Sequence, residues 1–304
     1  MAHDHHHHHH HADGAGDGKL WIAVAVNMAL TLAQIVGGVL SGSLAMIADA
    51  LHNFSDAISL IIAFWARRIA RRPADDRMTF GYGRAEIVAA LINYTTLIVI
   101  GVYLAFEAVL RFFDPIEVNG WLVVVIAAVA LVVDLVTAAL TYSMAKDSVN
   151  IRAAFLHNLA DAMGSVVVIV AGAAIMLYGW RWVDPVATLA IAGYILWMAF
   201  SEIGGVIRIL MLGRPPELAP DAVLAAVEAM DGVAGVHHAH LWQMDEHRSA
   251  MQAHVVIAEG HWTRADTIKA QLKAHLSTAF GIHHLSLEME SERNACVRPA
   301  QYGS

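Results

Sequence analysis

Charged side chains are scarce in this sequence of 304 residues: 15% are Asp, Glu, Lys or Arg, whereas 58% are hydrophobic. A soluble domain normally carries about a quarter charged residues. The deficit is concentrated between residues 20 and 212, and the residues from 213 onward have the composition of a soluble domain. This division predicts a membrane-embedded part, 20–212, followed by a water-exposed part.

Cysteine is nearly absent. The single Cys296 excludes an internal disulfide, and its place in a polar segment gives no reason to expect a catalytic or thiolate-ligand role. The net charge of -8 disfavours nucleic acid as a partner and is compatible with cations. Histidine, by contrast, occurs 19 times, and eight copies lie in an N-terminal tail, 1–19. That tail is either a native metal-binding segment or a purification tag, and both readings stay open.

Six apolar stretches are each long enough to cross a bilayer, for which a helix needs about 20 residues. They cover residues 20–40, 44–65, 85–107, 121–143, 151–177 and 185–207. Arg and Lys gather in the second and fourth connections, whereas the first, third and fifth carry only Arg111 and Arg181. The positive-inside rule therefore places both termini in the cytoplasm. We expect a multi-pass protein of the cell membrane, and the compact six-span form favours a bacterial inner membrane.

The water-exposed part, 213–291, predicts a small α+β domain. Helical periodicity covers 221–230 and 263–280, and strand-like alternation covers 236–244, 251–259 and 283–290. The order helix, strand, strand, helix, strand is typical of a ferredoxin-like sandwich. Residues 292–304 form a C-terminal tail.

Two predicted spans carry ionisable side chains, which cost several kcal/mol inside a bilayer and so need a reason. The heptapeptide LHNFSDA at 51–57 and its near-copy LHNLADA at 156–162 agree at Leu, His, Asn, Asp and Ala. In each copy the His and the Asp are four residues apart, so the two project from one helix face. His52 and Asp56 are thereby paired on the second span, and His157 and Asp161 on the fifth.

If the two helices face each other, two imidazoles and two carboxylates converge. Such a set suits tetrahedral Zn²⁺, whereas Mg²⁺ or Ca²⁺ would take more oxygen ligands; Cd²⁺, Co²⁺ and Ni²⁺ stay open. The alternative is two interhelical His–Asp hydrogen bonds without a metal. Asp49, on the same face as His52, is a candidate outer-sphere partner that orients this imidazole, and a role as a cap or in a pair elsewhere is equally open.

Other polar side chains in the spans have less definite roles. Asp134, alone in the fourth span, is open to a proton relay, an outer-sphere contact or a helix–helix hydrogen bond. Asn27 and Gln34 share one face of the first span, where we expect them to hold helices together.

The sequence resembles the cation diffusion facilitators, proton-coupled exporters of zinc and related ions, over residues 21–290. The resemblance is carried by SLAMIADALH (43–52) running into Asp56 and by HNLAD (157–161). It extends to FGYGRAE (80–86), VHHAHLW (236–242) and HLSLEME (284–290). Each motif is weak alone, and their order and spacing make the match specific.

The resemblance implies a homodimer that alternates access to a transport site at His52, Asp56, His157 and Asp161. It also implies that the soluble domain packs against its twin and binds a regulatory zinc ion. The cytoplasmic ligands that it implies are His237, His254, Glu288 and Glu290. His240 and His284 are nearby candidates.

The sequence therefore predicts an exporter of Zn²⁺, with Cd²⁺, Co²⁺ or Ni²⁺ as further substrates, that exchanges the metal for H⁺. An enzyme is not expected, because no His-Glu-x-x-His motif occurs and the four ligands leave no open position for water. A passive channel would need a continuous polar pore, which the spans lack. The main alternative is a membrane-anchored metal sensor or storage protein.

Overall fold

The structure is a computed structural model that describes residues 15–142, 149–297 and 300–303. For residues 15–27, 140–142, 149–154 and 157 it describes the helical backbone but not the side chain. The N-terminal histidine tract lies outside the described residues. The chain divides into two compact units, Met1–Ile61 with Asn93–Phe200 and Ile62–Ile92 with Ser201–Ser304.

In the described part of the chain, six long helices precede the C-terminal domain. Five of them are long and apolar enough to cross a membrane. In the first helix of the chain, the part whose side chains are described, Met28–Ser41, is a shorter apolar helix. The predicted class, a helical membrane part followed by an α+β domain, is confirmed. The helices are α1 (Ala15–Ser41), α2 (Leu44–Ala70), α3 (Ala85–Phe113), α4 (Gly120–Tyr142), α5 (Val149–Tyr178) and α6 (Val183–Leu210).

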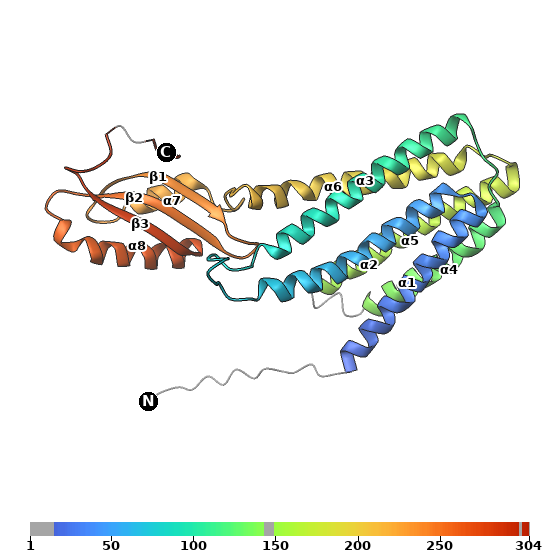
Figure 1. The fold of residues 1–304 in the computed structure, drawn as a ribbon, viewed down its shortest axis with the longest axis horizontal. Coiled ribbons are helices and arrows are strands. Elements are labelled where there is room, and N and C mark those ends of the chain that lie inside the picture. The colour runs from blue at the N-terminus through green and yellow to red at the C-terminus, as the bar shows by residue number, and fades with distance from the viewer. Residues whose placement is uncertain (1–14, 143–148, 298–299, 304) are drawn as a thin grey trace. The chain divides into compact units, whose positions relative to one another are not determined.

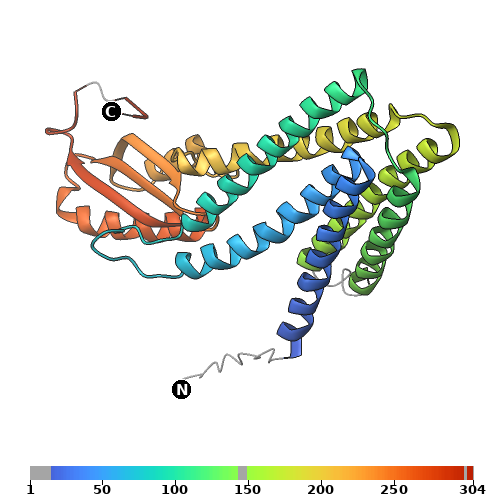
Figure 2. The ribbon, with the colours of Figure 1, turned by 45° about the vertical axis from the view of Figure 1, so that its right-hand side comes forward.

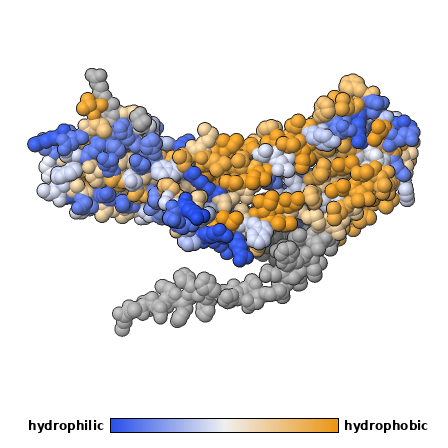
Figure 3. Space-filling model, in the orientation of Figure 1, coloured by the Kyte–Doolittle hydropathy of each residue, from blue (hydrophilic) through white to orange (hydrophobic). Residues whose placement is uncertain are grey.

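The first unit is a helical bundle whose inside and outside are both apolar. In it α4 packs along α5, and α1 packs along α4 (Figure 1). Its core is built from small and branched side chains such as Ala48, Leu104 and Ile195, all fully buried. Large hydrophobic side chains also cover the outer surface, and Figure 3 shows them over the helices while hydrophilic residues gather over the C-terminal domain. A helix that is apolar all round is suited to lipid rather than water.

The N-terminus of α2 is capped by a carboxylate from another helix. The Ser43 hydroxyl accepts a hydrogen bond from Met46 N–H at 3.1 Å, the usual N-cap interaction, and donates to Asp184 Oδ1 at 2.5 Å. Asp184, in the first turn of α6, also accepts the N–H groups of Leu44 at 2.8 Å and Ala45 at 3.4 Å. These residues are buried, so the first N–H groups of α2 depend on Asp184 and Ser43 for partners.

We expect Asp184→Ala to lower the stability of the helical bundle by roughly 2–4 kcal/mol, because buried N–H donors lose their acceptor. Ser43→Ala removes one hydroxyl and should cost about 1 kcal/mol. The shift in Tm of the detergent-solubilised protein measures both. Equal Tm values for the wild type and Asp184→Ala would show that the cap is dispensable.

The C-terminal domain contains α7 (Pro220–Glu228), β1 (Val233–Gln243), β2 (Ser249–Ile257), α8 (Ala265–Phe280) and β3 (Ile282–Ser291). The predicted order of helices and strands is confirmed. The sheet order is β1-β2-β3, with β1 antiparallel and β3 parallel to the central β2. Strands β2 and β3, joined by α8, are therefore direct neighbours, whereas a complete ferredoxin-like sheet inserts a strand between such a pair.

Both helices of this domain pack on one face of the sheet (Figure 1, Figure 2). Because side chains alternate along a strand, Met251, Ala253 and Val255 of β2 join this core, while His254 points to the opposite face. We call that second face the open face of the sheet, because neither α7 nor α8 covers it. The candidate ligands on these strands are His254 on β2 and His284, Glu288 and Glu290 on β3. All four occupy strand positions whose side chains point to the open face.

The connection between α2 and α3 docks on the turn that joins β1 to β2. Arg84 donates from Nε to the Met244 carbonyl at 3.1 Å and from Nη2 to the Gln243 carbonyl at 3.3 Å. Gly83 approaches the same turn so closely that a Cβ there would lie 2.7 Å from Asp245 Oδ2. The motif FGYGRAE, which was part of the family resemblance, thus has a structural role in this unit.

Candidate metal site among the helices

Two elements bring three of the predicted ligands together. His52 and Asp56 lie one turn apart on α2, and their side chains face Asp161 on α5. His52 Nε2 is 3.6 Å from Asp56 Oδ2 and 3.9 Å from Asp161 Oδ1. One ligand atom from each of the three residues lies within 4.8 Å of the other two. The side chains are 8%, 23% and 10% exposed respectively, so they are largely withdrawn from the surface of the bundle.

The fourth predicted ligand, His157, lies on α5 one turn before Asp161. Its side chain is outside the described residues. A His and an Asp four apart on a helix share a face, so the backbone of α5 is consistent with the predicted pairing.

Asp49 lies one turn before His52 on α2 and is held by a partner from α1. Gln34 Nε2 donates to Asp49 Oδ2 at 2.9 Å, and both side chains are buried. The expectation that Gln34 holds helices together is therefore confirmed. The outer-sphere role predicted for Asp49 toward His52 stays a prediction.

Gly164 on α5 allows a close approach to this carboxylate. A Cβ at position 164 would lie 2.6 Å from Asp49 Oδ1, much closer than real Cβ contacts. Asp49 cannot easily move aside, because it is buried and bonded to Gln34. Since Asp161 lies one turn before Gly164, the absence of a side chain here sets how closely the two ligand-bearing helices meet.

Gly164→Ala should therefore destabilise the protein and weaken metal binding, although alanine is the better helix former by about 1 kcal/mol. Gly193→Ala on α6 is the matched control, because a Cβ there would meet no described atom within 4 Å. We expect the control to raise Tm slightly and Gly164→Ala to lower it. A rise in both would contradict the close approach.

Asp134 on α4 is bonded to α5 outside the three-ligand cluster. Ser165 Oγ donates to Asp134 Oδ2 at 3.3 Å, and both residues are buried. Of the roles left open for Asp134, a helix–helix hydrogen bond is thus observed. Polar residues in apolar spans mark interhelical contacts in membranes, and this pattern singled out Gln34 in the sequence. Ser165 and Asp184 share the pattern but had no predicted role.

The three-ligand cluster offers one imidazole and two carboxylates, ligand types that suit Zn²⁺ or a similar divalent ion. We expect Asp161→Asn to bind one Zn²⁺ fewer per chain at high affinity, because a site that lacks one of its ligands holds the ion less tightly. Asp134→Asn is the matched control and should keep the wild-type stoichiometry. Titration calorimetry of the purified proteins measures the difference, and an unchanged stoichiometry in Asp161→Asn would exclude Asp161 as a ligand.

In the C-terminal domain, four of the six predicted ligands come together on the open face. His254 Nδ1 is 2.7 Å from Glu290 Oε1, and its Nε2 is 3.3 Å from Glu288 Oε2. His237 Nε2 is 3.2 Å from Glu290 Oε2. The hydrogen bond with His254 holds the pKa of Glu290 below its ordinary value, although burial acts in the opposite direction.

The other two predicted ligands lie apart from this cluster. His240 is exposed and lines a pocket with Trp242 and Tyr302. His284 is exposed and contacts the edge of Phe80, with ring centroids 6.0 Å apart. Neither belongs to a group of candidate metal ligands among the described residues.

The helices and the cluster between α2 and α5 define a polytopic membrane protein with a candidate metal-ligand set inside the bundle. Residues 20–211 match the family model of the cation efflux transmembrane domain, and residues 215–292 match that of the cation efflux protein cytoplasmic domain. The chain belongs to this family, the cation diffusion facilitators, which are membrane transporters.

Several curated relatives align along nearly the whole chain. A "cadmium, cobalt and zinc/H(+)-K(+) antiporter" of Bacillus subtilis is 33% identical over 96% of this chain and 93% of its own length. The zinc transporter ZitB of Pectobacterium atrosepticum is 33% identical over 96% of this chain and 90% of its own. The metal cation efflux system protein CzcD of Cupriavidus metallidurans is 32% identical over 95% of this chain and 89% of its own.

Among solved structures, the metal-bound C-terminal domain of the CzcD transporter is 23% identical and covers 24% of this chain and 99% of its own length, with a TM-score of 0.23. The Bacillus subtilis relative is named for cadmium, cobalt and zinc, the Pectobacterium atrosepticum relative for zinc, and the Cupriavidus metallidurans relative for metal cation efflux. The function that the family models assign to this chain is cation efflux.

Proposed function

We propose that the protein exports Zn²⁺ from the cytoplasm in exchange for H⁺, through a site formed by His52, Asp56, His157 and Asp161. The observation that carries the proposal is that His52 and Asp56 on α2 lie close to Asp161 on α5. Three ionisable groups held together among apolar helices are costly without a ligand. The name of the antiporter relative supports the exchange with protons.

Competition between metal and protons explains how such a site loads and unloads. Imidazole binds a metal ion when it is neutral, and protonation removes the lone pair that the metal uses. A site open to the cytoplasm exchanges its protons for Zn²⁺. When the site opens to the other side at lower pH, protonation of His52 or His157 weakens it and releases the ion. Rocking of helix bundles around a fixed central site would supply the change of access.

The membrane arrangement follows the sequence prediction, with residues 20–212 in a bacterial inner membrane, residues 213–291 in the cytoplasm and both termini on the cytoplasmic side. The arginine-rich connection between α2 and α3 supports this orientation, because it docks through Arg84 on the C-terminal domain. We further propose a homodimer joined through the C-terminal domains. The family model that matches residues 215–292 is named for dimerisation and supports this assembly.

Liposomes containing purified protein test the exchange. We expect zinc uptake that is driven by an outward proton gradient in the wild type and lost in Asp161→Ala, because a site short of one ligand no longer holds the ion. The control Gly193→Ala should transport like the wild type. A fluorescent zinc indicator inside the liposomes measures the initial rate.

Two results would count against the proposal. Zinc flux that ignores the imposed pH gradient would remove proton exchange but keep transport. Equal uptake in the wild type and Asp161→Ala, or none in either, would favour the alternative of a membrane-anchored metal sensor and leave the His–Asp pairs with a structural role.

A further inference from the structure

A cavity of about 840 Å³ lies where the C-terminal end of α2 and the N-terminal end of α3 approach the turn between β1 and β2. All the residues that line it belong to the unit Ile62–Ile92 with Ser201–Ser304. Its volume is in the range of sites that hold a whole small molecule, about 300–1,000 Å³. The described residues that line it include no His, Cys, Asp or Glu, so its ligand is not a metal ion. We call it the α2–α3 cavity.

Each of the two helices lines the α2–α3 cavity with one apolar face. On α2 this face begins at Ile62 and continues three, four and seven residues later with Trp65, Ala66 and Ile69. On α3 the same spacing runs from Ala85 to Ile92. Residues at these intervals lie on one side of a helix. Both helices are apolar enough to cross a membrane, so these walls are suited to contact with hydrocarbon.

Large apolar side chains along the cavity are left uncovered by the protein. Trp65, Phe80 and Ile92 line it, and each side chain is more than half exposed. Trp242 reaches the same cavity from β1. An indole combines an apolar ring system with one N–H donor and is favoured at the boundary between hydrocarbon and water. Exposed apolar surface of this kind marks a binding site.

The cavity also has a positively charged side. Residues 67–84 contain six arginines and two aspartates, which leaves a net charge of +4. Arg77 and Arg84 of this segment line the cavity, and Arg248 joins them from the turn between β1 and β2. Apolar walls and guanidinium groups therefore meet in one place, as they would around a ligand with an apolar tail and an anionic head.

Two of these three arginines keep their charge free of a carboxylate. Arg248 is paired with Asp245 at 2.6 Å. Arg84 donates to backbone carbonyls instead, at 3.1 and 3.3 Å. In the described part of the chain, the ion pairs formed by arginines include neither Arg77 nor Arg84. Both remain available to an anionic group from outside the protein.

Charge distinguishes between the possible occupants of the cavity. A second copy of the chain would meet this surface across a two-fold axis, so the arginines of one copy would face those of the other. A lipid with a phosphate brings the opposite charge and supplies acyl chains for the apolar faces. Basic pockets between membrane helices bind anionic lipid head groups for this reason.

We propose that the α2–α3 cavity binds one anionic glycerophospholipid, with its phosphate toward Arg77 and Arg84 and an acyl chain along the apolar faces of α2 and α3. Because Trp242 and Arg248 line the same cavity, the lipid contacts the C-terminal domain as well as the two helices. This binding does not depend on which ion the protein exports or on exchange with protons.

Native mass spectrometry of the full-length protein in detergent tests the proposal, because it counts the lipids that each chain retains. We expect one phosphatidylglycerol per chain to be held tightly. Phosphatidylcholine with the same acyl chains should bind at least about fivefold more weakly, since each basic residue near a membrane surface contributes about this factor toward an anionic lipid. Inorganic phosphate should not displace the lipid, because it has no apolar part.

Two variants address the two sides of the cavity. Arg77→Gln should weaken phosphatidylglycerol binding about fivefold. Val88→Trp, at an exposed position of the α3 face, fills the cavity without changing its charge and should weaken the binding of both lipids. Arg71→Gln is the matched control, because it removes the same charge from the same segment at a position that does not line the cavity, and it should bind like the wild type.

Three results would overturn the proposal. Equal affinity for the two lipids, or an equal loss in Arg77→Gln and Arg71→Gln, would reduce the effect to general attraction between charges. Displacement by inorganic phosphate would show a site for the anion alone. A changed ratio of monomer to dimer in Val88→Trp, with lipid binding unchanged, would assign this surface to a second copy of the chain.

Discussion

The rest of the molecule depends on holding His52, Asp56 and Asp161 together away from water. Each group would lose hydration energy on entering an apolar bundle, and the cost is offset only where partners meet it at close range. That meeting requires α2 and α5 to lie at a defined distance and rotation. The polar contacts elsewhere in the bundle serve this requirement: Asp184 anchors the start of α2, and Gly164 lets α5 approach it.

The acidic side chains of the bundle differ in the groups that they contact. Asp184 accepts hydrogen bonds from a helix N-terminus, where a negative charge is favoured by the exposed N–H groups. Asp49 and Asp134 each accept a hydrogen bond from a neutral side chain of another helix. Asp56 and Asp161 instead face an imidazole, a pairing that a divalent cation can join. A carboxylate in a membrane helix is therefore assigned by its partner, because the residue type alone is the same in all five.

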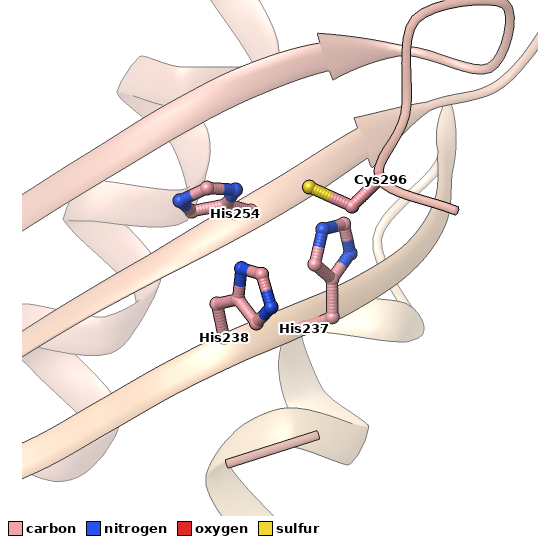
Figure 4. Close-up of side chains that lie close together, drawn as sticks. All are labelled: His237, His238, His254 and Cys296. Atoms are coloured by element: carbon pink, nitrogen blue, oxygen red, sulfur yellow. The ribbon is translucent and has the colours of Figure 1, made fainter. Parts of the chain in front are cut away.

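The C-terminal domain repeats the chemistry of histidine with carboxylate or thiolate, but on a sheet. Its two helices fill one face, so the second face is free to carry polar side chains. A bulge in β1 and a returning tail then concentrate ligands from distant segments at one point. The ligand cluster in the bundle draws its side chains from two helices, whereas His237 and His254 lie opposite each other on paired strands (Figure 4).

Hydropathy and periodicity in the sequence by themselves determined the spans, the order of elements in the C-terminal domain and the two His–Asp pairs. These features are local: a span is a continuous apolar run, and partners four residues apart share a helix face whatever else the chain does. The tertiary structure decided four other features. They are the cap by Asp184, the close approach at Gly164, the extra residue of β1 at His238 and the position of Cys296 near β1. Their partners lie far away along the chain. A contact between residues so far apart produces no periodicity and no local composition from which it could be predicted.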